Sequence, residues 1–382
     1  MSFSSPRPNR YGNRGRQGRV ARASRALGIS VAGGAALGLL LSRFINYHPR
    51  PVERIVPFNI AGAPVLPQTR RIRAVTFNVQ FFAGTRYRFF YDGGPDTLLV
   101  ARDDIEKTAA RIAAFIESYA VDIVLLQEVD SSARRTAYIN QIALLRAALS
   151  RELQNHVAAY YWKSKFVPHP KVLGSAGTQL VTISRYRMGT AYRYQLPYAP
   201  GNPIERDFNF KRAILEVDLP ISSGSSVTVL NTHLEAFPKG SNVQERQVQK
   251  LLERLNLLTR MGQPWILGGD FNLLPPGQAT RLAPRNRGIH REPSALGPIY
   301  ERYAGVPPIS DATGEEMERC FTFTQKTGDT RIPVRTLDYF FASPAVKIER
   351  YTVPQDEMMD ASDHLPLIAE FTLLDAGKSA FR

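Results

Sequence analysis

The stretch Leu267-Gly268-Gly269-Asp270-Phe271-Asn272 decides how the rest of this chain is organised. It continues an apolar run that begins at Trp265, which indicates the buried end of a strand. The two glycines allow the backbone to turn sharply. Asp270 and Asn272 follow two residues apart, so in extended backbone their side chains share one face. A carboxylate beside an amide suits the holding of a water molecule next to a phosphate, although taken alone both residue types are common in structural turns.

The composition limits the classes of protein that this chain can belong to. Its 382 residues suffice for one large domain or two ordinary ones, and a hydrophobic content of 43% predicts a sizeable core. The net charge of +15 is uneven: residues 1–73 hold 13 basic and one acidic residue (+12), and residues 74–382 hold 36 and 33 (+3). The main part is therefore not a strongly basic nucleic-acid-binding protein, although a local patch stays open. A single cysteine, Cys320, excludes an intramolecular disulfide framework.

Three segments of different composition precede the main domain. Residues 1–26 carry seven arginines and no acid, and we expect a basic disordered tail. Residues 27–45 are mostly apolar, and a helix there would cross the ~30 Å hydrocarbon core if Arg43 reached the membrane surface. A signal peptide is the alternative for this segment. Residues 46–70 contain five prolines and predict a linker.

The charges around the apolar segment predict an orientation. Seven arginines precede residue 27, whereas Arg43, Arg50 and Arg54 lie at its end or follow it closely. The excess of positive charge before the segment predicts an N-terminus in the cytoplasm. We therefore expect a membrane-anchored protein whose main domain, residues 71–374, lies in a periplasm or an equivalent extracytoplasmic space, with a short tail over 375–382.

Residues 71–374 have the patterns of a mixed α and β domain. Apolar runs that end in polar residues predict strands, and three amphipathic stripes predict helices. Strands and helices do not alternate regularly, which favours an α+β sandwich over a doubly wound sheet. Residues 277–318 are irregular and rich in Pro, Gly and Arg, and are expected to be an insertion. The predicted strands cover 72–78, 121–126, 178–184, 213–219, 227–232, 265–267, 337–342, 346–352 and 364–373, and the predicted helices cover 103–116, 138–149 and 248–258.

Polar side chains stand at several of the predicted strand ends. Singly, each has a structural explanation, such as a turn cap, an ion pair or a buried histidine. Together, five strand ends with oxygen ligands and two histidines in one domain are hard to attribute to turns. The motifs that carry them are Thr76-Phe77-Asn78, Leu126-Gln127-Glu128, Asn231-Thr232-His233-Leu234-Glu235, Gly269-Asp270-Phe271-Asn272, Leu337-Asp338-Tyr339 and Ser362-Asp363-His364.

This ordered set of motifs resembles the endonuclease/exonuclease/phosphatase family, the group related to DNase I, abasic-site endonucleases, neutral sphingomyelinases and inositol polyphosphate 5-phosphatases. The resemblance covers about residues 71–374. It implies a four-layered α/β sandwich of two packed mixed sheets flanked by helices, with the site at one edge of the sheets. It also implies hydrolysis of a phosphate ester with Mg²⁺ as the cofactor and Mn²⁺ as the alternative metal.

The resemblance implies roles for single residues. Glu128 matches the family's principal Mg²⁺ ligand, Asn78 matches its neighbour, and Asp363 matches a residue near the metal or its water. Asp270 and Asn272 match the pair that orients and activates the attacking water. Oxygen ligands of this kind suit Mg²⁺, which keeps water molecules in its coordination shell.

Four further positions match groups around the phosphate. His364 matches the family's histidine at the phosphate, and Asp338 matches the carboxylate that orients its ring. His233 matches a second position that contacts the phosphate. Arg212 lies where several relatives place an arginine, and this match is looser. A cation together with these side chains would stabilise the charge that develops on the phosphoryl oxygens.

The substrate stays open at the level of sequence. The aromatic loop over 81–91 and the anchor favour a phosphodiesterase that hydrolyses a lipid head group or a similar phosphate ester. Arg86, Arg88 and the arginines of the insertion keep an endonuclease or exonuclease acting on DNA or RNA as the alternative. A non-catalytic binding module is disfavoured because every core motif position is intact. The expected partners are the phosphate-ester substrate and a membrane through residues 27–45.

Overall fold

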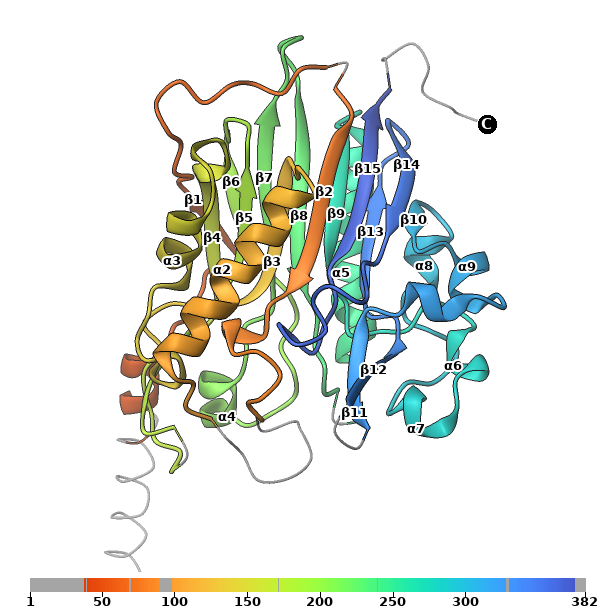
Figure 1. Cartoon of the computed structure of the whole chain (residues 1–382). Coiled ribbons are helices and arrows are strands. Elements are labelled where there is room, and N and C mark those ends of the chain that lie inside the picture. The colour runs from red at the N-terminus through yellow and green to blue at the C-terminus, as the bar shows by residue number, and fades with distance from the viewer. Residues whose placement is uncertain are drawn as a thin grey trace, which may run out of the picture.

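Two large mixed β-sheets pack face to face, and helices cover both outer faces (Figure 1). The computed structural model describes residues 38, 40–68, 70–89, 98–170, 172–238, 240–327 and 330–374. The predicted α+β class and its four-layered sandwich are confirmed by this arrangement of helix, sheet, sheet and helix.

The first sheet has six strands and is covered by α2 (Arg102–Ser118) and α3 (Gln141–Ala148). The apolar stripe of α2, including Ile105 and Ile112, packs in one buried cluster with Phe77 and Leu126 of the sheet. Strands β2 and β3 run parallel, and the other neighbouring strands run antiparallel. The strand order is β14 (Val346–Thr352), β15 (Leu367–Leu373), β2 (Ile72–Asn78), β3 (Ile123–Asp130), β5 (Gly174–Ser184) and β4 (Asn155–Val167).

The second sheet has seven strands and is covered by α5 (Val243–Arg260) and α8 (Gly297–Tyr300). Leu251 and Leu255 of α5 pack in one cluster with Leu230 and Leu267 of the sheet. Strands β8 and β9 are the parallel pair. The strand order is β1 (Val52–Ile55), β6 (Ala191–Gln195), β7 (Ala213–Pro220), β8 (Ser226–His233), β9 (Trp265–Asp270), β13 (Asp338–Ala342) and β10 (Ala304–Val306).

A polar contact joins the two sheets inside an otherwise apolar interface. Gln127 Nε2, from the first sheet, donates a hydrogen bond to Asn231 Oδ1 of the second sheet over 2.8 Å. Asn231 Nδ2 in turn donates to the main-chain oxygens of Leu126 and Val181 in the first sheet. Buried amides that are hydrogen-bonded across the interface in this way favour one relative position of the two sheets.

The remaining elements lie around the edge of the sandwich. Residues 277–318, expected to be an irregular insertion, contain short helices and the edge strand β10. Strands β1, β4, β6, β11 and β12 were not among the predicted strands. The other elements are the hairpin β11 (Phe323–Thr327) and β12 (Thr330–Arg335), the helices α4 (Pro203–Phe208), α6 (Gln278–Arg281), α7 (Pro284–Arg287) and α9 (Ile309–Thr313), and the 3₁₀ turns η1 (Gln80–Phe82), η2 (Arg134–Thr136), η3 (Arg151–Gln154) and η4 (Met317–Cys320).

The prediction of a membrane-anchored protein with a periplasmic or extracytoplasmic domain is wrong. Within the part of the chain that the structure describes, no helix is both long and apolar enough to cross a membrane. Most of the predicted span, residues 27–37 and 39, lies outside the described residues, as does the predicted tail over 1–26. The described end of the span contacts the domain instead, because Ser42 Oγ donates a hydrogen bond to Asp207 Oδ2 over 2.7 Å.

The described residues of the segment predicted as a linker, 46–68 and 70, lie against the domain. Strand β1 pairs with the edge strand β6 of the second sheet. The main-chain groups of Phe58 and His156 exchange hydrogen bonds of 2.8 and 3.0 Å, and Leu66 is fully buried. This segment therefore extends the second sheet by one strand.

The described part of the aromatic loop, residues 81–89, packs onto the sandwich edge. Phe81, Phe82 and Phe89 are buried, and Phe81 meets Phe89 edge-on at 5.0 Å. The guanidinium of Arg135 lies 3.3 Å from the centre of the Phe81 ring, a cation–π contact. Residues 90–97 lie outside the described residues. These described rings are therefore not available as a lipid-facing surface.

The Gly268-Gly269 pair allows close packing at the end of β9, which leads to a stability prediction. A Cβ at Gly269 would lie 2.1 Å from the main-chain oxygen of Thr232 on β8. This clash could be relieved only by moving the backbone of one of the two paired strands. Gly269→Ala is therefore expected to lower the free energy of unfolding by at least about 2 kcal/mol. Gly297→Ala is the matched control, because its Cβ meets nothing within 4 Å. Chemical denaturation checks both, and equal stability of the two variants would contradict the packing argument.

Candidate active site

The register of the sheets brings the predicted strand ends to one edge of the sandwich. In the second sheet, His233 pairs with Asp270 across β8 and β9, and Asp270 pairs with Asp338 across β9 and β13. In the first sheet, Asn78 at the end of β2 lies beside Gln127 on β3. Because both parallel pairs end at this edge, side chains far apart in sequence meet there.

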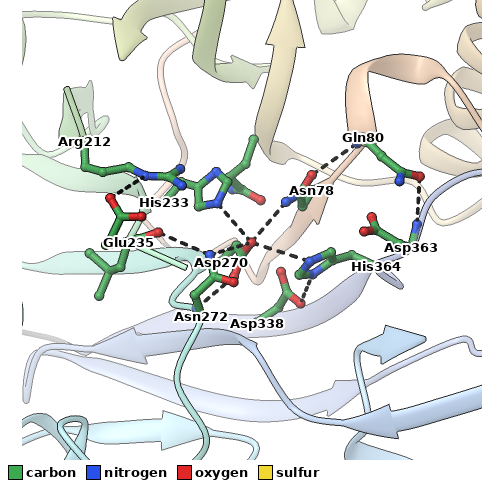
Figure 2. Close-up of polar contacts among 12 residues, drawn as sticks. Asn78, Gln80, Arg212, His233, Glu235, Asp270, Asn272, Asp338, Asp363 and His364 are labelled. Carbon is green, nitrogen blue, oxygen red and sulfur yellow. Dashed lines mark hydrogen bonds and ion pairs between the residues drawn. The ribbon is translucent and has the colours of Figure 1, made fainter. Parts of the chain in front are cut away.

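One oxygen of Asp270 is the centre of the site (Figure 2). Its Oδ2 accepts hydrogen bonds from Asn78 Nδ2 over 3.0 Å and from Asn272 Nδ2 over 3.3 Å. His233 Nε2 and His364 Nε2 lie 3.3 and 3.6 Å from the same oxygen. Burial, with a contribution from the nearby Asp338, raises the pKa of Asp270 to about 6 against the stabilising effect of His364.

His364 is held by Asp338, which lies behind it. His364 Nδ1 is 2.8 Å from Asp338 Oδ2, and the ring of Phe323 packs edge-on against the imidazole at 5.1 Å. Burial opposes a charge on His364, but Asp338 and Asp270 outweigh it and raise the pKa of His364 to about 10. The imidazole is therefore protonated at neutral pH, with Nε2–H directed towards Asp270.

Arg212 offers hydrogen-bond donors that the protein leaves unused. Its side chain is 4% exposed, and neither Nε nor Nη1 has a hydrogen-bond partner among the residues that the structure describes. The nearest carboxylate oxygen, Glu235 Oε2, lies 3.9 Å from Nε. The guanidinium packs on the rings of Phe210 and Tyr161, 4.6 and 5.3 Å from their centres. Because an unpaired buried donor is costly, this group suits an anionic ligand.

His233 lies between Arg212 and Asp270. Burial and the positive charge of Arg212 hold the pKa of His233 well below its usual value, so the ring is neutral. With Nε2 directed at Asp270 Oδ2, Nδ1 has no hydrogen-bond partner in the described part of the chain. The neutral ring can thus donate one hydrogen bond without adding charge to the site.

Glu128 is turned into the site by a β-bulge. The register of β3 against β5 shifts between Leu126 and Val129, and Glu128 takes the left-handed backbone conformation with φ 60°. Among the described residues its carboxylate has no hydrogen-bond partner, and burial together with Asp363 raises its pKa to about 8. Arg135, His364 and Arg212 only partly offset the effects of burial and of Asp363, and two carboxylates that repel each other in this way match the needs of a bound cation.

The residues around Glu128 fit a divalent metal. Asn78 and Asp363 lie in the same pocket and add an amide and a carboxylate oxygen. Gln80 connects them, since its main-chain N–H donates to Asn78 Oδ1 over 3.1 Å and its Oε1 accepts from the main-chain N–H of Asp363 over 3.3 Å. This donor set consists of hard oxygens, which Mg²⁺ prefers.

A second group is also close enough to bind an ion. One ligand atom from each of Asp270, Asp338 and His364 lies within 4.8 Å of the others. The 2.8 Å contact between His364 Nδ1 and Asp338 already uses one histidine nitrogen and one carboxylate oxygen of that group. The positive charge of His364 further disfavours a cation there, so the Glu128 group is the better metal site.

Backbone strain gathers around this pocket. Glu128, Asn272, Gln80 and Phe81 all have positive φ, from 41° to 60°. Each non-glycine residue in the left-handed region costs about 1–3 kcal/mol, and such residues concentrate at functional sites. The strain therefore supports a site that is shaped for function rather than for stability.

Eight of the nine predicted site residues line one pocket of about 250 Å³, and Asp338 lies behind His364. The pocket has further walls that sequence analysis missed. They come from β4, the start of β7, the β11–β12 hairpin and the insertion, and no motif marks them. The additional lining includes Tyr161, Phe210, Phe323, Arg335 and the segment Gly288-Ile289-His290.

Comparison with known proteins identifies the fold and the family. The sequence profile of the Endonuclease/Exonuclease/phosphatase family matches residues 75–364. The structure is similar to an endonuclease/exonuclease/phosphatase from Beutenbergia cavernae, with a TM-score of 0.54 and 23% identity over 80% of this chain and 72% of that chain. It is also similar to the human Nocturnin catalytic domain with a bound sulfate anion, with a TM-score of 0.50 and 17% identity over 81% and 95%. A sequence search of curated proteins found no match.

The fold and site define a metal-dependent phosphoester hydrolase. The chain belongs to the endonuclease/exonuclease/phosphatase family, because the family match spans well over half of its residues. The predicted family, enzyme class and dependence on a divalent metal are thereby confirmed.

The contact between His364 and Asp338 leads to a prediction about pH dependence. Asp338→Asn removes the charge that raises the pKa of His364, so the imidazole loses its proton at lower pH. We expect kcat/KM to fall by about 10- to 100-fold at neutral pH and its alkaline limb to move from near pH 10 towards neutrality. Asp311→Asn is a control, because Asp311 lies outside the pocket and accepts a hydrogen bond from Tyr351. A pH profile of Asp338→Asn that matches the wild type would refute the orienting role.

Proposed function

We propose that this chain is a metal-dependent phosphodiesterase in which residues 71–374 form the catalytic domain. The observation that carries the proposal is the convergence in one pocket of an unpaired arginine, a protonated histidine and a carboxylate of raised pKa. These are the groups needed to hold a phosphate, to supply a proton and to accept one from water. The family match over residues 75–364 supports the extent of the domain.

In this proposal Glu128, Asp363 and Asn78 hold the metal, with Mg²⁺ preferred and Mn²⁺ as the alternative. When bound, the divalent cation would polarise the phosphoryl group and stabilise its developing charge. Its charge would also remove the repulsion that raises the pKa of Glu128.

Asp270 is the proposed general base. A pKa of about 6 leaves its carboxylate ionised at neutral pH while making it more basic than an ordinary aspartate. Asn272 and Asn78 side chains donate to its Oδ2, and the main-chain N–H of Asn272 donates to Oδ1 over 2.9 Å, so the carboxylate is held with one lone pair of Oδ1 left for a water molecule. The water would give its proton to Asp270 and attack the phosphorus.

Arg212 and His364 are proposed to bind the phosphoryl oxygens. Arg212 directs unused N–H groups at the ligand, and His364 carries a proton on Nε2 that can move to the leaving oxygen. His233 stays neutral beside them and directs its Nε2 at Asp270 Oδ2. The guanidinium and the imidazolium together carry two positive charges, which match the two negative charges that develop when hydroxide adds to a phosphodiester.

A phosphodiester of small organic substituents is favoured over a nucleic-acid strand as the substrate. Arg86 is paired with Asp104, Arg281 donates to the main-chain oxygen of Thr313, and the insertion arginines do not line the described pocket. The packing of Phe81 and Phe89 removes the support for a loop that enters lipid. A nuclease acting on DNA or RNA is the second candidate, because the family includes endonucleases and exonucleases.

The experiment that tests the function uses the full chain with Mg²⁺. Hydrolysis of bis(p-nitrophenyl) phosphate, plasmid DNA, sphingomyelin and an inositol polyphosphate is measured with and without chelator. We expect metal-dependent release of nitrophenol, and loss of turnover by about 10²–10³-fold in Asp270→Asn. Absence of activity on all four substrates would refute the proposal.

The metal site leads to a separate prediction about Mg²⁺ affinity. Because the pKa of Glu128 is about 8 in the metal-free protein, binding at pH 7 must displace a proton, and affinity should rise about tenfold per pH unit below pH 8. Glu128→Gln should remove this pH dependence and weaken binding, whereas Asp270→Asn should keep it. Calorimetric titration in buffers of different ionisation enthalpy measures affinity and released protons together. Equal loss of metal binding in both variants would overturn the division of roles.

A further inference from the structure

A groove larger than the catalytic pocket lies directly beside it. Its volume is about 860 Å³, and it runs between the first half of α5 and residues 289–301. Leu273 and Leu274, which follow the Asp270-Asn272 motif, form part of its wall. Gln244 joins the groove to the site, because its Nε2 donates to the main-chain oxygens of Glu235 and Asn272 over 2.7 and 3.2 Å.

The groove and the pocket share a common ridge. Ile289 and His290 line both cavities. Two consecutive residues lie on either side of this ridge, because Phe237 lines the pocket and Pro238 lines the groove. The side chain of Ile289 is 58% exposed, so the ridge is low and apolar rather than a closed wall.

The pocket opens towards this ridge. Of the residues that line it, only Phe237, Gly288 and Ile289 fall in the exposed class among those described. The rest of the described lining is buried or half-buried, including Tyr161 and Phe323, whose ring contacts His364 and supports the guanidinium of Arg335 at 4.3 Å. A phosphodiester has two substituents, and a pocket of about 250 Å³ cannot enclose both when either is long. The second substituent must therefore leave across the ridge.

The charge of the groove limits what it can accept. Its ionisable lining consists of three glutamates and two arginines, a net charge of −1, with Glu292 occupied as an acceptor from the main chain of Gly277 and Ser294. A groove that followed a nucleic-acid backbone would need an excess of positive charge. The exposed Ile289 and three prolines, Pro238, Pro293 and Pro298, supply apolar surface instead, and Leu273 and Leu274 are buried beneath.

We propose that this groove is a substrate subsite that binds an uncharged, partly apolar organic substituent of the phosphodiester. The inference rests on the proposed phosphodiesterase function and deepens it by assigning the class of the group attached to the phosphate. It assigns the preference for that group to the wall formed by α5, Leu273-Leu274 and residues 289–301. A polyanionic strand is excluded by the same wall.

Gly297 provides a way to fill the groove without disturbing the fold. It lines the groove, its backbone has no positive φ, and a Cβ there would meet nothing within 4 Å. Gly297→Trp therefore places a large side chain in the groove. Ala304→Trp on the edge strand β10 is the matched control, because Ala304 is exposed and lines neither cavity.

The test compares three p-nitrophenyl phosphodiesters whose second substituent is methyl, hexyl or 5-carboxypentyl. In the wild type we expect kcat/KM for the hexyl ester to exceed that for the methyl ester about tenfold, through burial of methylene groups. The 5-carboxypentyl ester, of matching length but with one more negative charge, should fall below the hexyl ester. Gly297→Trp should bring the hexyl-to-methyl ratio towards one, mainly through KM, and Ala304→Trp should keep the wild-type ratio.

The outcomes separate the two proposals. If the wild type hydrolyses none of the esters, the proposed function fails. If it hydrolyses the methyl ester but shows no preference for hexyl, or if Gly297→Trp keeps the wild-type ratio, the groove is not a subsite and the proposed function stands. A preference for the carboxylate ester, or for the p-nitrophenyl ester of a thymidine oligonucleotide, would overturn the assigned class. Thermal unfolding of Gly297→Trp within a few degrees of the wild type confirms that its effect is local.

Discussion

The close packing of the two sheets at one edge is the constraint on which the rest of the structure depends. Gly268 is squeezed between Phe340 of its own sheet and Leu125 of the other, where a Cβ would come within 2.7 Å of both. The hydrogen bond between Gln127 and Asn231 joins the sheets at the same level. Gln127 directly precedes the pocket residue Glu128, and Asn231 lies two residues before the pocket residue His233. Fixing the sheets here therefore fixes the distances across the site.

The site holds its charges in an arrangement that the protein does not neutralise by itself. Burial raises the pKa of Glu128 and of Asp270, while Arg212 keeps two donors without partners. Such groups destabilise a folded protein unless a ligand compensates them. A divalent cation and a phosphate would supply the missing opposite charges, so the same features that cost stability favour binding. The left-handed backbone conformation at Glu128 and Asn272 likewise costs stability. Such strain is tolerated where it directs a side chain into a functional site.

Local composition was a poor guide at the N-terminal side of the domain. Residues 46–70 are rich in proline and were expected to be a linker, yet β1 pairs with an edge strand there. Edge strands tolerate proline nearby because one of their two sides needs no hydrogen bonds. The aromatic loop was equally ambiguous, because rings at a sheet edge and rings at a membrane have the same composition. Burial of Phe81, Phe82 and Phe89 decides between these alternatives.

The sequence by itself determined the fold class and the residues at the strand ends, because alternating and continuous apolar runs mark strands and Gly-Gly-Asp marks where one turns. Eight of the nine predicted site residues belong to short motifs of this kind, whereas Arg212 was predicted only from the looser resemblance to the family. Tyr161, Arg335 and Ile289 could not, because they belong to no motif and reach the pocket only through the pairing of distant strands and the path of the insertion. The tertiary structure alone decided which oxygen of Asp270 the site converges on, how Glu128 is turned inward and where the groove lies. These depend on register, on a bulge and on packing between segments, and none of them is a property of local sequence.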